Sequence, residues 1–338
     1  MTTNVDGELR LQDAPPIPGL WFRLFDPGRD YEGLVALIRE ANLADGVPLI
    51  PTVDNLRADH EHGGEYDPRC DLLVALVDGT IVGASETNVR TRADGPDHYV
   101  EGWVSPAFRR RGLGRALLHW AEARAREVAL VDGRTGVRSL SSWPDESQVG
   151  AVALYESEGY AIVRYGFLMV RDLAEPIADA PLPDGLEVRP VDPKDHRRIW
   201  DADEEAFRDH WNPGERTDAD FEGWFASPEL DTSLWRVAWD GDEVAGSVMN
   251  FIFPAENETL GQRRGWLEHV SVRRPWRRRG LASALIADSM RALRDAGMAE
   301  AGLGVDAENL SGALRIYEAL GFRRMQTGVA YRKVFTAD

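Results

Sequence analysis

The stretch VRRPWRRRGLASALI, residues 272–286, has a run of three consecutive arginines and a glycine, RRRG at 277–280, between the end of an apolar segment and the start of a helical pattern. A second stretch, VSPAFRRRGLGRALL at residues 104–118, has the same plan. Arg109 and Arg277 lie 168 positions apart (277 − 109 = 168), which is close to half of the 338-residue chain. This spacing indicates an internal duplication rather than a chance repetition.

Other segments recur in the same order at similar offsets. FRLFDPGRD in the first half matches VRPVDPKDH in the second, and ALYESEGY matches RIYEALGF. Between the copies, the segment AEPIADAPLPDG is rich in Pro, Ala and Asp and lacks apolar periodicity. We therefore predict an N-terminal domain at 1–173, a linker at 174–185 and a C-terminal domain at 186–338.

Each copy predicts the same series of elements. An opening strand and a helix precede a β-hairpin, whose tight turn lies at Asp78-Gly79 in the first copy and at Asp240-Gly241 in the second. A strand then leads into the arginine-glycine segment, and a helix, a strand, a short helix with a tyrosine and a final strand complete the unit. The predicted class is α+β: two tandem domains, each with a mixed, mostly antiparallel sheet flanked by helices.

Composition narrows the classes of function. The formal net charge is −18 and the pI about 4.9, so the averaged field repels nucleic acid and we expect no nucleic-acid partner. The acidic balance suits a cationic substrate, and it equally suits a protein that only has to stay soluble. The single Cys70 cannot form an internal disulfide, and no apolar run approaches the roughly 18 residues that would span a bilayer. We expect a cytoplasmic monomer or homodimer without membrane contact.

The arginine-glycine segment has the features of an anion site. A strand that stops at Val272 and a helix that starts near Leu281 leave backbone N–H groups exposed at a helix N-terminus. These groups and the positive end of the helix dipole bind phosphate oxygens, and nearby arginines add attraction and hydrogen bonds. The small residues Gly280 and Ala282 let a bulky diphosphate approach the backbone. A pyrophosphate is therefore the ligand that we expect.

Together with the Tyr-x-x-x-Gly-aromatic pattern that follows in each half, both segments resemble the acetyl-CoA signature of the Gcn5-related N-acetyltransferase (GNAT) family. The resemblance covers nearly the whole chain, once per half, and the tandem layout is similar to two-domain acetyltransferases of the mycothiol synthase type. It implies acetyl-CoA as the acyl donor and no metal. In the second half the implied cofactor-binding residues are Val270, Val272, Arg277, Arg278, Arg279, Gly280, Leu281, Ala282 and Asn309. In the first half they are Val104, Arg109, Arg110, Arg111, Gly112, Leu113 and Gly114.

Direct attack of an amine on a thioester needs a neutral amine, a polarised carbonyl and a protonated leaving thiolate. The resemblance implies that Tyr317 faces the coenzyme sulfur, where its hydroxyl would act as general acid; the competing role of the ring is packing alone. Glu268 and His269 are adjacent on the strand that would flank the thioester, and alternation sends them to opposite faces, so at most one points at the amine. We favour Glu268 as the base, with His269 as the alternative and a backbone N–H near Val270 as the oxyanion donor.

His210 and Trp211, with the acidic run at 201–205, precede the second hairpin, where the resemblance implies recognition of the acceptor. An aromatic wall beside carboxylates suits a cationic amine, whereas a core tryptophan and a solvated acidic helix face would explain the same residues. The HEH triplet at 60–62 has no further His or Cys nearby, so we interpret it as a surface loop rather than a metal site.

The two halves are not equivalent. The first half has Ser147 where the second has Asn309, and an offset of 168 places Val100, not Glu101, at the position of Glu268. We therefore expect catalysis in the second half, while the first half binds coenzyme A without turnover, buttresses the fold or is itself active. The leading function is transfer of an acetyl group to a primary amine of a small molecule within a ternary complex. A coenzyme-A-binding regulatory or structural protein without catalysis, and a peptide or protein N-acetyltransferase, are the competing interpretations.

Overall fold

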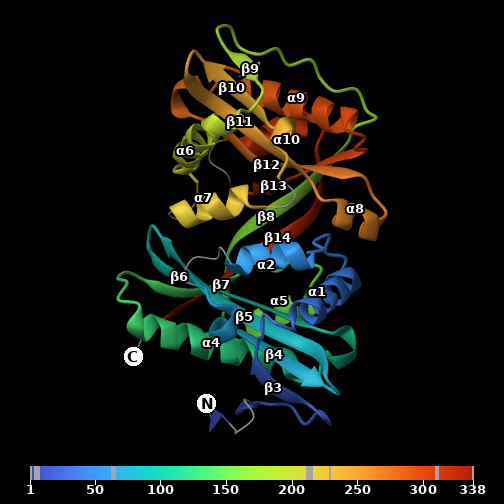
Figure 1. Ribbon diagram of the computed structural model, residues 1–338, viewed down its shortest axis with the longest axis vertical. Helices are drawn as coiled ribbons and strands as arrows, with labels where there is room; N and C mark the ends of the chain where they lie inside the picture. Colours follow the sequence, from blue (N-terminus) through green and yellow to red (C-terminus); the bar gives the residue numbers. More distant parts are fainter. Residues whose placement is uncertain are drawn as a thin grey trace. The chain divides into compact units, whose positions relative to one another are not determined.

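The structure is a computed structural model that describes residues 2–3, 8–61, 66–210, 216–227, 230–308 and 312–336. The chain forms two compact units, and each contains a β-sheet with helices packed on it (Figure 1). Unit 1 comprises Met1–Val163, Thr217–Ser227 and Val329–Asp338. Unit 2 comprises Arg164–Arg216 and Pro228–Gly328.

Unit 1 has a sheet in the strand order β1-β2-β3-β4-β5-β6-β7-β14; among its described residues, only β6 and β7 pair in parallel. Its strands are β1 (Thr2–Thr3), β2 (Leu9–Arg10), β3 (Trp21–Leu24), β4 (Leu72–Val77), β5 (Thr80–Arg92), β6 (Gly95–Val104), β7 (Arg138–Ser142) and the end of β14 (Arg323–Phe335). Its helices are α1 (Tyr31–Asp45), α2 (Val53–Glu61), α3 (Pro68–Asp71), the 3-10 helix η1 (Pro106–Phe108), α4 (Leu113–Val131), α5 (Val149–Ser157) and α7 (Asp218–Phe225).

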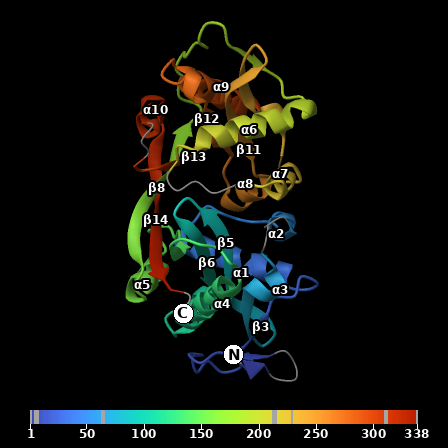
Figure 2. The ribbon, with the colours of Figure 1, turned by 90° about the vertical axis from the view of Figure 1, so that its left-hand side faces the viewer.

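The alternation of side chains along β4 divides the interior of unit 1 into two cores. Leu73 packs with Leu117 of α4 on one face of the sheet. Leu72 and Val74 pack with Leu34 of α1 on the other face. Both helices also contact β5 and β6 (Figure 2). Burial of each such leucine stabilises the fold by roughly 1.5–3 kcal/mol, so the hairpin is held firmly between two helical layers.

Unit 2 repeats this plan in the strand order β8-β13-β12-β11-β10-β9, and β12 with β13 is the one parallel pair in the part of this unit that the structure describes. Its strands are β8 (Ala161–Asp172, from Arg164 onward), β9 (Glu187–Arg189), β10 (Arg236–Asp240), β11 (Glu243–Ile252), β12 (Arg264–Val272) and β13 (Glu300–Asp306). Its helices are the 3-10 helices η2 (Pro193–Asp195), η3 (Thr232–Leu234) and η4 (Arg274–Trp276), with α6 (His196–Phe207), α8 (Pro254–Leu260), α9 (Leu281–Asp295) and α10 (Ala313–Ala319).

The main core of unit 2 lies between α9 and the sheet. Leu285 of α9 packs there with Ala238 of β10 and Leu267 of β12. Helix α6 contacts β11 and β12, and its buried Ile199 and Trp200 are not part of this core. The strand β12 is thus held by two helices, and it is the strand that leads into the second arginine-glycine loop.

The last strand of each half belongs to the other unit. From Arg164 onward, β8 pairs with β13 in unit 2. At the end of the chain, residues 331–335 of β14 pair antiparallel with β7 in unit 1. The compact units therefore cut across the predicted ranges 1–173 and 186–338, because hydrogen bonds between strands can join segments that are distant in the sequence.

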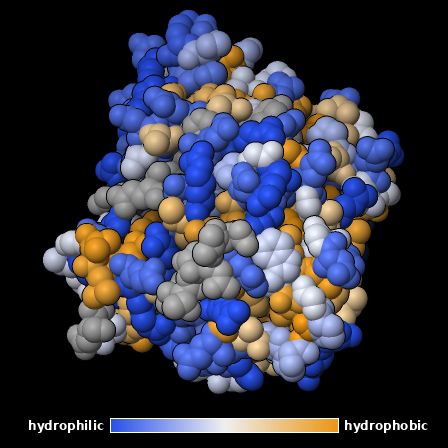
Figure 3. All heavy atoms as spheres, turned by 60° about the horizontal axis from the view of Figure 1, so that its bottom comes forward, coloured by the Kyte–Doolittle hydropathy of each residue, from blue (hydrophilic) through white to orange (hydrophobic). Residues whose placement is uncertain are grey.

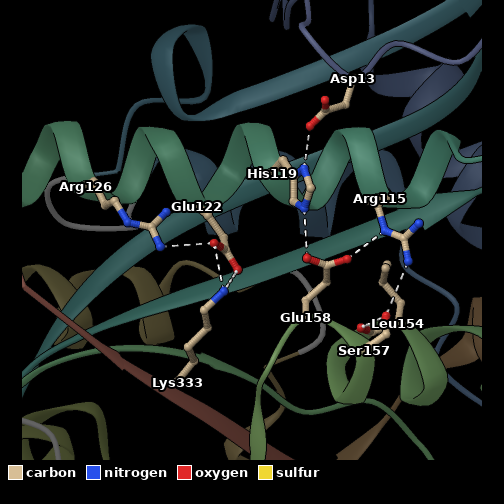
Figure 4. Close-up of polar contacts among 9 residues, drawn as sticks. All are labelled: Asp13, Arg115, His119, Glu122, Arg126, Leu154, Ser157, Glu158 and Lys333. Carbon is tan, nitrogen blue, oxygen red and sulfur yellow. Dashed lines mark hydrogen bonds and ion pairs between the residues drawn. The ribbon is translucent and has the colours of Figure 1, made fainter.

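The C-terminal strand is anchored in unit 1 by charged side chains (Figure 4). Lys333 Nζ donates to both carboxylate oxygens of Glu122 on α4, at 2.9 and 3.1 Å. Arg126, one turn further along α4, donates to the same carboxylate at 3.1 Å. Glu122 is only 5% exposed, and a buried carboxylate is stable when cations compensate it. The exchanged strand is therefore an integral part of this unit.

The hairpin turns differ between the units. In unit 1 the turn is Asp78-Gly79, as predicted, and both residues have positive φ, 50° and 79°. In unit 2 the pairing of Asp240 with Glu243 places the turn at Gly241-Asp242, so the predicted Asp240-Gly241 turn is wrong by one residue. Gly241, with φ of 57°, occupies the first turn position, where glycine adopts the left-handed conformation without strain.

The predicted linker at 174–185 forms neither helix nor strand. Its Ile177 and Leu182 pack against the core of unit 2, and Arg279 donates to the carbonyl of Asp184 at 3.2 Å. The segment is therefore bound to unit 2 along its length.

Hydrophilic and hydrophobic side chains are interspersed on the face drawn in Figure 3. Within the described ranges, no helix combines the length and the apolar character that crossing a bilayer requires.

Candidate functional site

The two arginine-glycine loops have the same backbone conformation. Arg110 and Arg278, the second arginine of each loop, are both left-handed with φ of 61°. Gly112, with φ of 92°, and Gly280, with φ of 85°, follow as the N-caps of α4 and α9. Left-handed residues between turn residues direct successive backbone N–H groups toward a common point, which makes a concave anion site. Each unit therefore offers the same N–H groups to an anion.

The first arginine of each loop serves as a clamp. Arg277 donates from Nε to the carbonyl of Val272 at 2.9 Å and from Nη1 to Asp209 at 2.5 Å. Arg109 does the same in unit 1, donating to the strand carbonyl before the loop at 3.1 Å and to Asp45 at 2.7 Å. These contacts tie each loop to the end of α6 or α1. The charge that remains for an anion comes from the second and third arginines, whose side chains are exposed.

The start of α9 leaves room for a large ligand. A Cβ placed on Gly280 would meet no atom within 4 Å, so the space beside the loop is open. The first N–H groups of a helix have no partner within it, so those of Leu281 and Ala282 point out of the helix start. The Leu281 side chain is 1% exposed and fixes this backbone to the core. The open space, the free N–H groups and the exposed arginines together fit a diphosphate.

Strand β12 separates from β13 part of the way along its length. Residues Arg264–Trp266 pair in parallel with Glu300–Gly302, and beyond this point β13 pairs only with β8. Among the described residues, no strand pairs with the stretch 267–272 of β12 on that side, and Val270 and Val272 pair with β11 on the other. An unpaired strand edge can bind an extended, amide-containing chain through backbone hydrogen bonds. This edge runs directly into the arginine-glycine loop.

At the separation point β12 contains one extra residue. Between two regular pairs, Met249 of β11 faces two residues of β12, Glu268 and His269. A bulge of this kind redirects side chains, so strand alternation does not decide where these two point. The Glu268 side chain reaches the surface, but the protein surrounding its carboxyl partly desolvates it and so raises its pKa, while the neighbouring His269 lowers it. A carboxylate with a raised pKa is suited to accept a proton near neutral pH.

The imidazole of His269 is held by helix α6. Its Nδ1 lies 2.7 Å from Oδ2 of Asp203 and 3.1 Å from Nη2 of Arg216. Asp203 has 0% exposure, and burial alone would raise its pKa, but His269 and Arg216 lower it. An ionised carboxylate bonded to one ring nitrogen fixes the orientation of an imidazole. His269 is therefore a firmly positioned group beside Glu268.

The two motif tyrosines have different surroundings. Tyr317 on α10 is 6% exposed and packs edge-on against Phe322, with 6.0 Å between ring centroids. Burial raises the pKa of Tyr317 to about 12, and its hydroxyl makes no hydrogen bond within the part of the chain that the structure describes. In unit 1 the hydroxyl of Tyr155 donates to the carbonyl of Val100 at 3.4 Å. Of the two hydroxyls, that of Tyr317 in unit 2 is therefore the one available to donate to a ligand.

In unit 1 the loop helix and the tyrosine helix are joined by charged side chains (Figure 4). Arg115 on α4 donates to Glu158 at 2.6 Å, and Nε2 of His119 lies 2.9 Å from the other oxygen of that carboxylate. Nδ1 of His119 lies 2.7 Å from Asp13. Although burial opposes the change, Glu158 and Asp13 raise the pKa of His119. These contacts hold α5, and with it Tyr155, against the start of α4.

Unit 1 has no bulge at the place that corresponds to the bulge of β12 in unit 2, within the described residues. Strand β6 pairs with β5 from end to end without a register shift, and Glu101 faces Glu86 at the place where the bulge stands in unit 2. The offset of 168 aligns Val100 with Glu268 because it does not count the extra residue of β12. When that residue is counted, Glu101 falls at the position that Glu268 and His269 share, so the offset alone does not decide which residue of unit 1 corresponds to Glu268.

Of the two residues expected to recognise the acceptor, His210 is described by the structure and Trp211 is not. His210 stacks on Phe207 with 4.4 Å between ring centroids, and Phe207 also contacts the ring of His269 at 5.3 Å. His210 is therefore joined to the Glu268 region through one aromatic ring. Trp211 and Asn309 lie outside the described residues.

The interpretation of the HEH triplet as a surface loop is wrong for its first residue. His60 lies on α2 and is 8% exposed, with Nδ1 3.2 Å from the hydroxyl of Tyr31. His62 lies outside the described residues. Within the described ranges, no three His, Cys, Asp or Glu side chains are arranged to share a metal ion.

Sequence reasoning misses the role of Asp203. It treats the run 201–205 as acceptor recognition or as a solvated helix face, whereas Asp203 is completely buried. One signal could have shown this: Asp203 lies four residues after Ile199 and three before Ala206, on the buried stripe of α6. A carboxylate on such a stripe needs a buried partner. Arg216, one of its two partners, carries no comparable signal.

Comparison with known proteins agrees with this architecture. The sequence profile of the acetyltransferase (GNAT) family matches the chain twice, at residues 39–160 and 196–322. A mycothiol acetyltransferase of Geodermatophilus obscurus is 31% identical over 303 residues, covering 89% of this chain and 93% of that protein. One of Salinispora tropica is 32% identical over 301 residues, covering 88% and 91%. A solved GCN5-related N-acetyltransferase from Sphaerobacter thermophilus has a TM-score of 0.70 at 27% identity, covering 94% of this chain and 96% of that one.

Proposed function

The chain belongs to the acetyltransferase (GNAT) family, and we propose that unit 2 transfers an acetyl group from acetyl-CoA to the primary amine of a small molecule. One observation carries this proposal: Glu268, the edge of β12 beyond its pairing with β13, and the arginine-glycine loop follow one another along a single stretch of chain. The groups that would meet the amine, the thioester arm and the diphosphate are thus ordered along one strand and the helix after it.

The donor, when bound, supplies an activated acyl carbon. The loop N–H groups between Arg277 and Ala282 would hold its pyrophosphate, and the two exposed arginines would add charge. The backbone of Val270 and Val272 would pair with the amide-containing arm. The open space at Gly280 accommodates the diphosphate without displacing any side chain.

Glu268 and Tyr317 move the protons in this proposal. The carboxylate of Glu268 accepts the proton that the amine must lose, and its raised pKa brings its proton affinity closer to the working pH. The hydroxyl of Tyr317 stays protonated, with a pKa of about 12, and donates to the leaving sulfur. A backbone N–H near Val270 stabilises the charge that develops on the carbonyl oxygen. His269, held by Asp203, acts as a positioning group rather than the base.

The acceptor is an amine that carries a positive charge in solution. The net charge of −18 attracts such a molecule. The rings of Phe207 and His210 give it an aromatic surface near His269. The relatives are named mycothiol acetyltransferases, so an amine acceptor of that type is the first one to test.

The test follows the release of free thiol from acetyl-CoA in the presence of a panel of primary amines, with the mycothiol-type amine, an aminoglycoside, a polyamine and a peptide included. We expect amine-dependent thiol release with at least one small-molecule amine. Replacement of Glu268 by Gln should lower kcat by about 10²–10⁴-fold, the usual range for a general base, with little change in acetyl-CoA affinity.

A matched control is Glu258→Gln, which changes an exposed carboxyl on α8 of the same unit. Its activity should equal that of the unchanged protein. Tight acetyl-CoA binding without thiol release for any amine would instead show a binding protein without catalysis.

A further inference from the structure

Unit 1 contains a cluster of ionisable side chains that the proposed function does not use. Glu86 on β5 and Glu101 on β6 are direct partners in the sheet, so their side chains leave the same face with Cβ atoms about 4.5–5.5 Å apart. This face packs on α1, since Ala84, two residues before Glu86, belongs to the α1 core. Among the described residues, neither carboxylate is paired with an arginine or a lysine.

Aromatic side chains from α1, α2 and the segment after α2 surround the two carboxylates. The hydroxyl of Tyr66 donates to Oε2 of Glu86 at 2.8 Å. The ring of His60 lies 5.2 Å from that of Tyr66 and 5.5 Å from that of Tyr31, measured between centroids. These rings form a wall with polar edges beside Glu86, which is the composition that binds organic cations.

One buried donor or acceptor in this wall has no partner. His60 is 8% exposed, and its Nε2 makes no hydrogen bond within the described part of the chain. That nitrogen lies 3.9 Å from Oε2 of Glu86, so it is near this carboxylate but too far away for a hydrogen bond. Burial lowers the pKa of His60 to about 4, so the ring is neutral and gives Glu86 no compensating charge.

The pKa values of the two carboxyl groups are raised, as expected for buried carboxylates that no positive charge compensates. Burial and the charge of Glu86 raise the pKa of Glu101 to about 8. Burial also raises the pKa of Glu86 to about 7, although the hydrogen bond from Tyr66 opposes the change. Two like charges facing each other across strands destabilise the sheet unless a proton or a cation lies between them.

We propose that Glu86 and Glu101, with Tyr66 and His60, form a binding site for a primary ammonium group in unit 1. An ammonium group has three donors and one positive charge, which suits two facing carboxylates and a neutral imidazole nitrogen. A divalent metal is a poorer match, because no three ligating side chains converge within the described ranges. The rings of Tyr66 and His60 then cover the organic part of the ligand.

The position of the cluster in the fold supports a ligand role. Strand β6 pairs with β7 only at Asp97–Tyr99, so Glu101 stands just beyond the point where these strands part. From there β6 continues to the arginine-glycine loop at Arg109–Gly114. In unit 2 the same place in the repeat is occupied by the two bulge residues, Glu268 and His269. The amine of unit 1 would therefore bind where an acceptor binds in the proposed function of unit 2.

The experiment titrates the full chain with phenethylamine, a primary ammonium with one ring, and with the uncharged 2-phenylethanol, by calorimetry. We expect saturable binding of phenethylamine, no binding of the alcohol, and a loss of affinity of at least about 10-fold in the Glu86→Gln, Glu101→Gln double variant. Glu268→Gln should retain this binding even though it loses turnover, so the outcome is separate from that of the proposed function.

A measurement on the unchanged protein guards against misfolding of the double variant. The ring proton signals of His60, assigned by their loss in His60→Asn, should shift as phenethylamine is added and stay in place with the alcohol. The proposal is overturned if phenethylamine shows no saturable binding up to tens of millimolar, if the double variant binds equally well, or if the His60 signals do not move.

Discussion

Oδ2 of Asp203 lies 2.7 Å from Nδ1 of His269, and the same oxygen accepts a hydrogen bond from Arg216 at 2.8 Å. A single buried carboxylate oxygen thus joins helix α6, the bulge of β12 and Arg216. The other oxygen, Oδ1, has no hydrogen-bond partner among the described residues. The arrangement therefore depends on the negative charge of Asp203 more than on a complete set of hydrogen bonds.

Asp203→Asn should weaken both the fold and the activity. Arg216 would lose its buried counter-charge, at a cost of roughly 1–3 kcal/mol in unfolding free energy, and His269 would lose its orientation, which should lower kcat. Thermal unfolding and steady-state kinetics measure the two effects. Asp201→Asn, on the exposed side of the same helix, should leave kcat unchanged and cost at most about 0.5 kcal/mol, because it removes only the exposed ion pair with Arg197; equal effects of the two substitutions would contradict the role of Asp203.

Tyr317→Phe should lower turnover by about 10²-fold with little change in acetyl-CoA affinity or stability, because only the proton donor is lost and the buried ring remains. Tyr155→Phe is the control, since the hydroxyl of Tyr155 bonds to the carbonyl of Val100. It should leave turnover unchanged. Thiol-release kinetics test both variants, and an unaffected Tyr317→Phe would remove the acid role.

Gly280→Val should abolish measurable acetyl-CoA binding to unit 2. The valine side chain would occupy the open space beside the loop, and its backbone would be strained at φ of 85°. Gly261→Val imposes similar strain at φ of 62°, at the end of α8, without touching the loop. Calorimetric titration with acetyl-CoA compares them. Equal binding by both variants would show that the loop does not contact the diphosphate.

Glu101→Gln should stabilise the protein at alkaline pH and have little effect near pH 5. The pKa of Glu101 is raised from 4.5 to about 8, so the native state keeps a proton that the unfolded chain releases above pH 4.5. The stability contribution of this group is therefore complete below pH 4.5 and falls as the pH rises to about 8. Glutamine removes this loss, which we expect to be roughly 1–3 kcal/mol, or several degrees in Tm, at pH 9.

Thermal unfolding of the variant and of the unchanged protein from pH 5 to pH 9 tests this expectation. Glu40→Gln, an exposed carboxyl on α1, should give a pH-independent difference. A constant difference for Glu101→Gln as well would mean that its carboxyl is not desolvated in the native state.

The sequence alone predicted the features that are set by residues adjacent to one another in the chain. The loop at Arg277–Gly280 is such a feature, because a strand end, a glycine and a helix start in succession leave N–H groups exposed wherever the rest of the chain lies. The turn at Asp78-Gly79 was predicted for the same reason, and the repeat was found by comparing the two halves of the sequence directly. The family followed from these patterns and is confirmed by the two profile matches.

Only the tertiary structure decided which side chains meet across the sheet. One extra residue in β12 puts both Glu268 and His269 at the position that Glu101 has in unit 1, and the regular pairing of β5 with β6 sets Glu101 against Glu86. The burial of Asp203 beside His269, and the pairing of the last strand with β7, likewise join segments far apart in the chain. Register and burial are properties of the assembled sheet, and a single inserted residue changes every alignment beyond it.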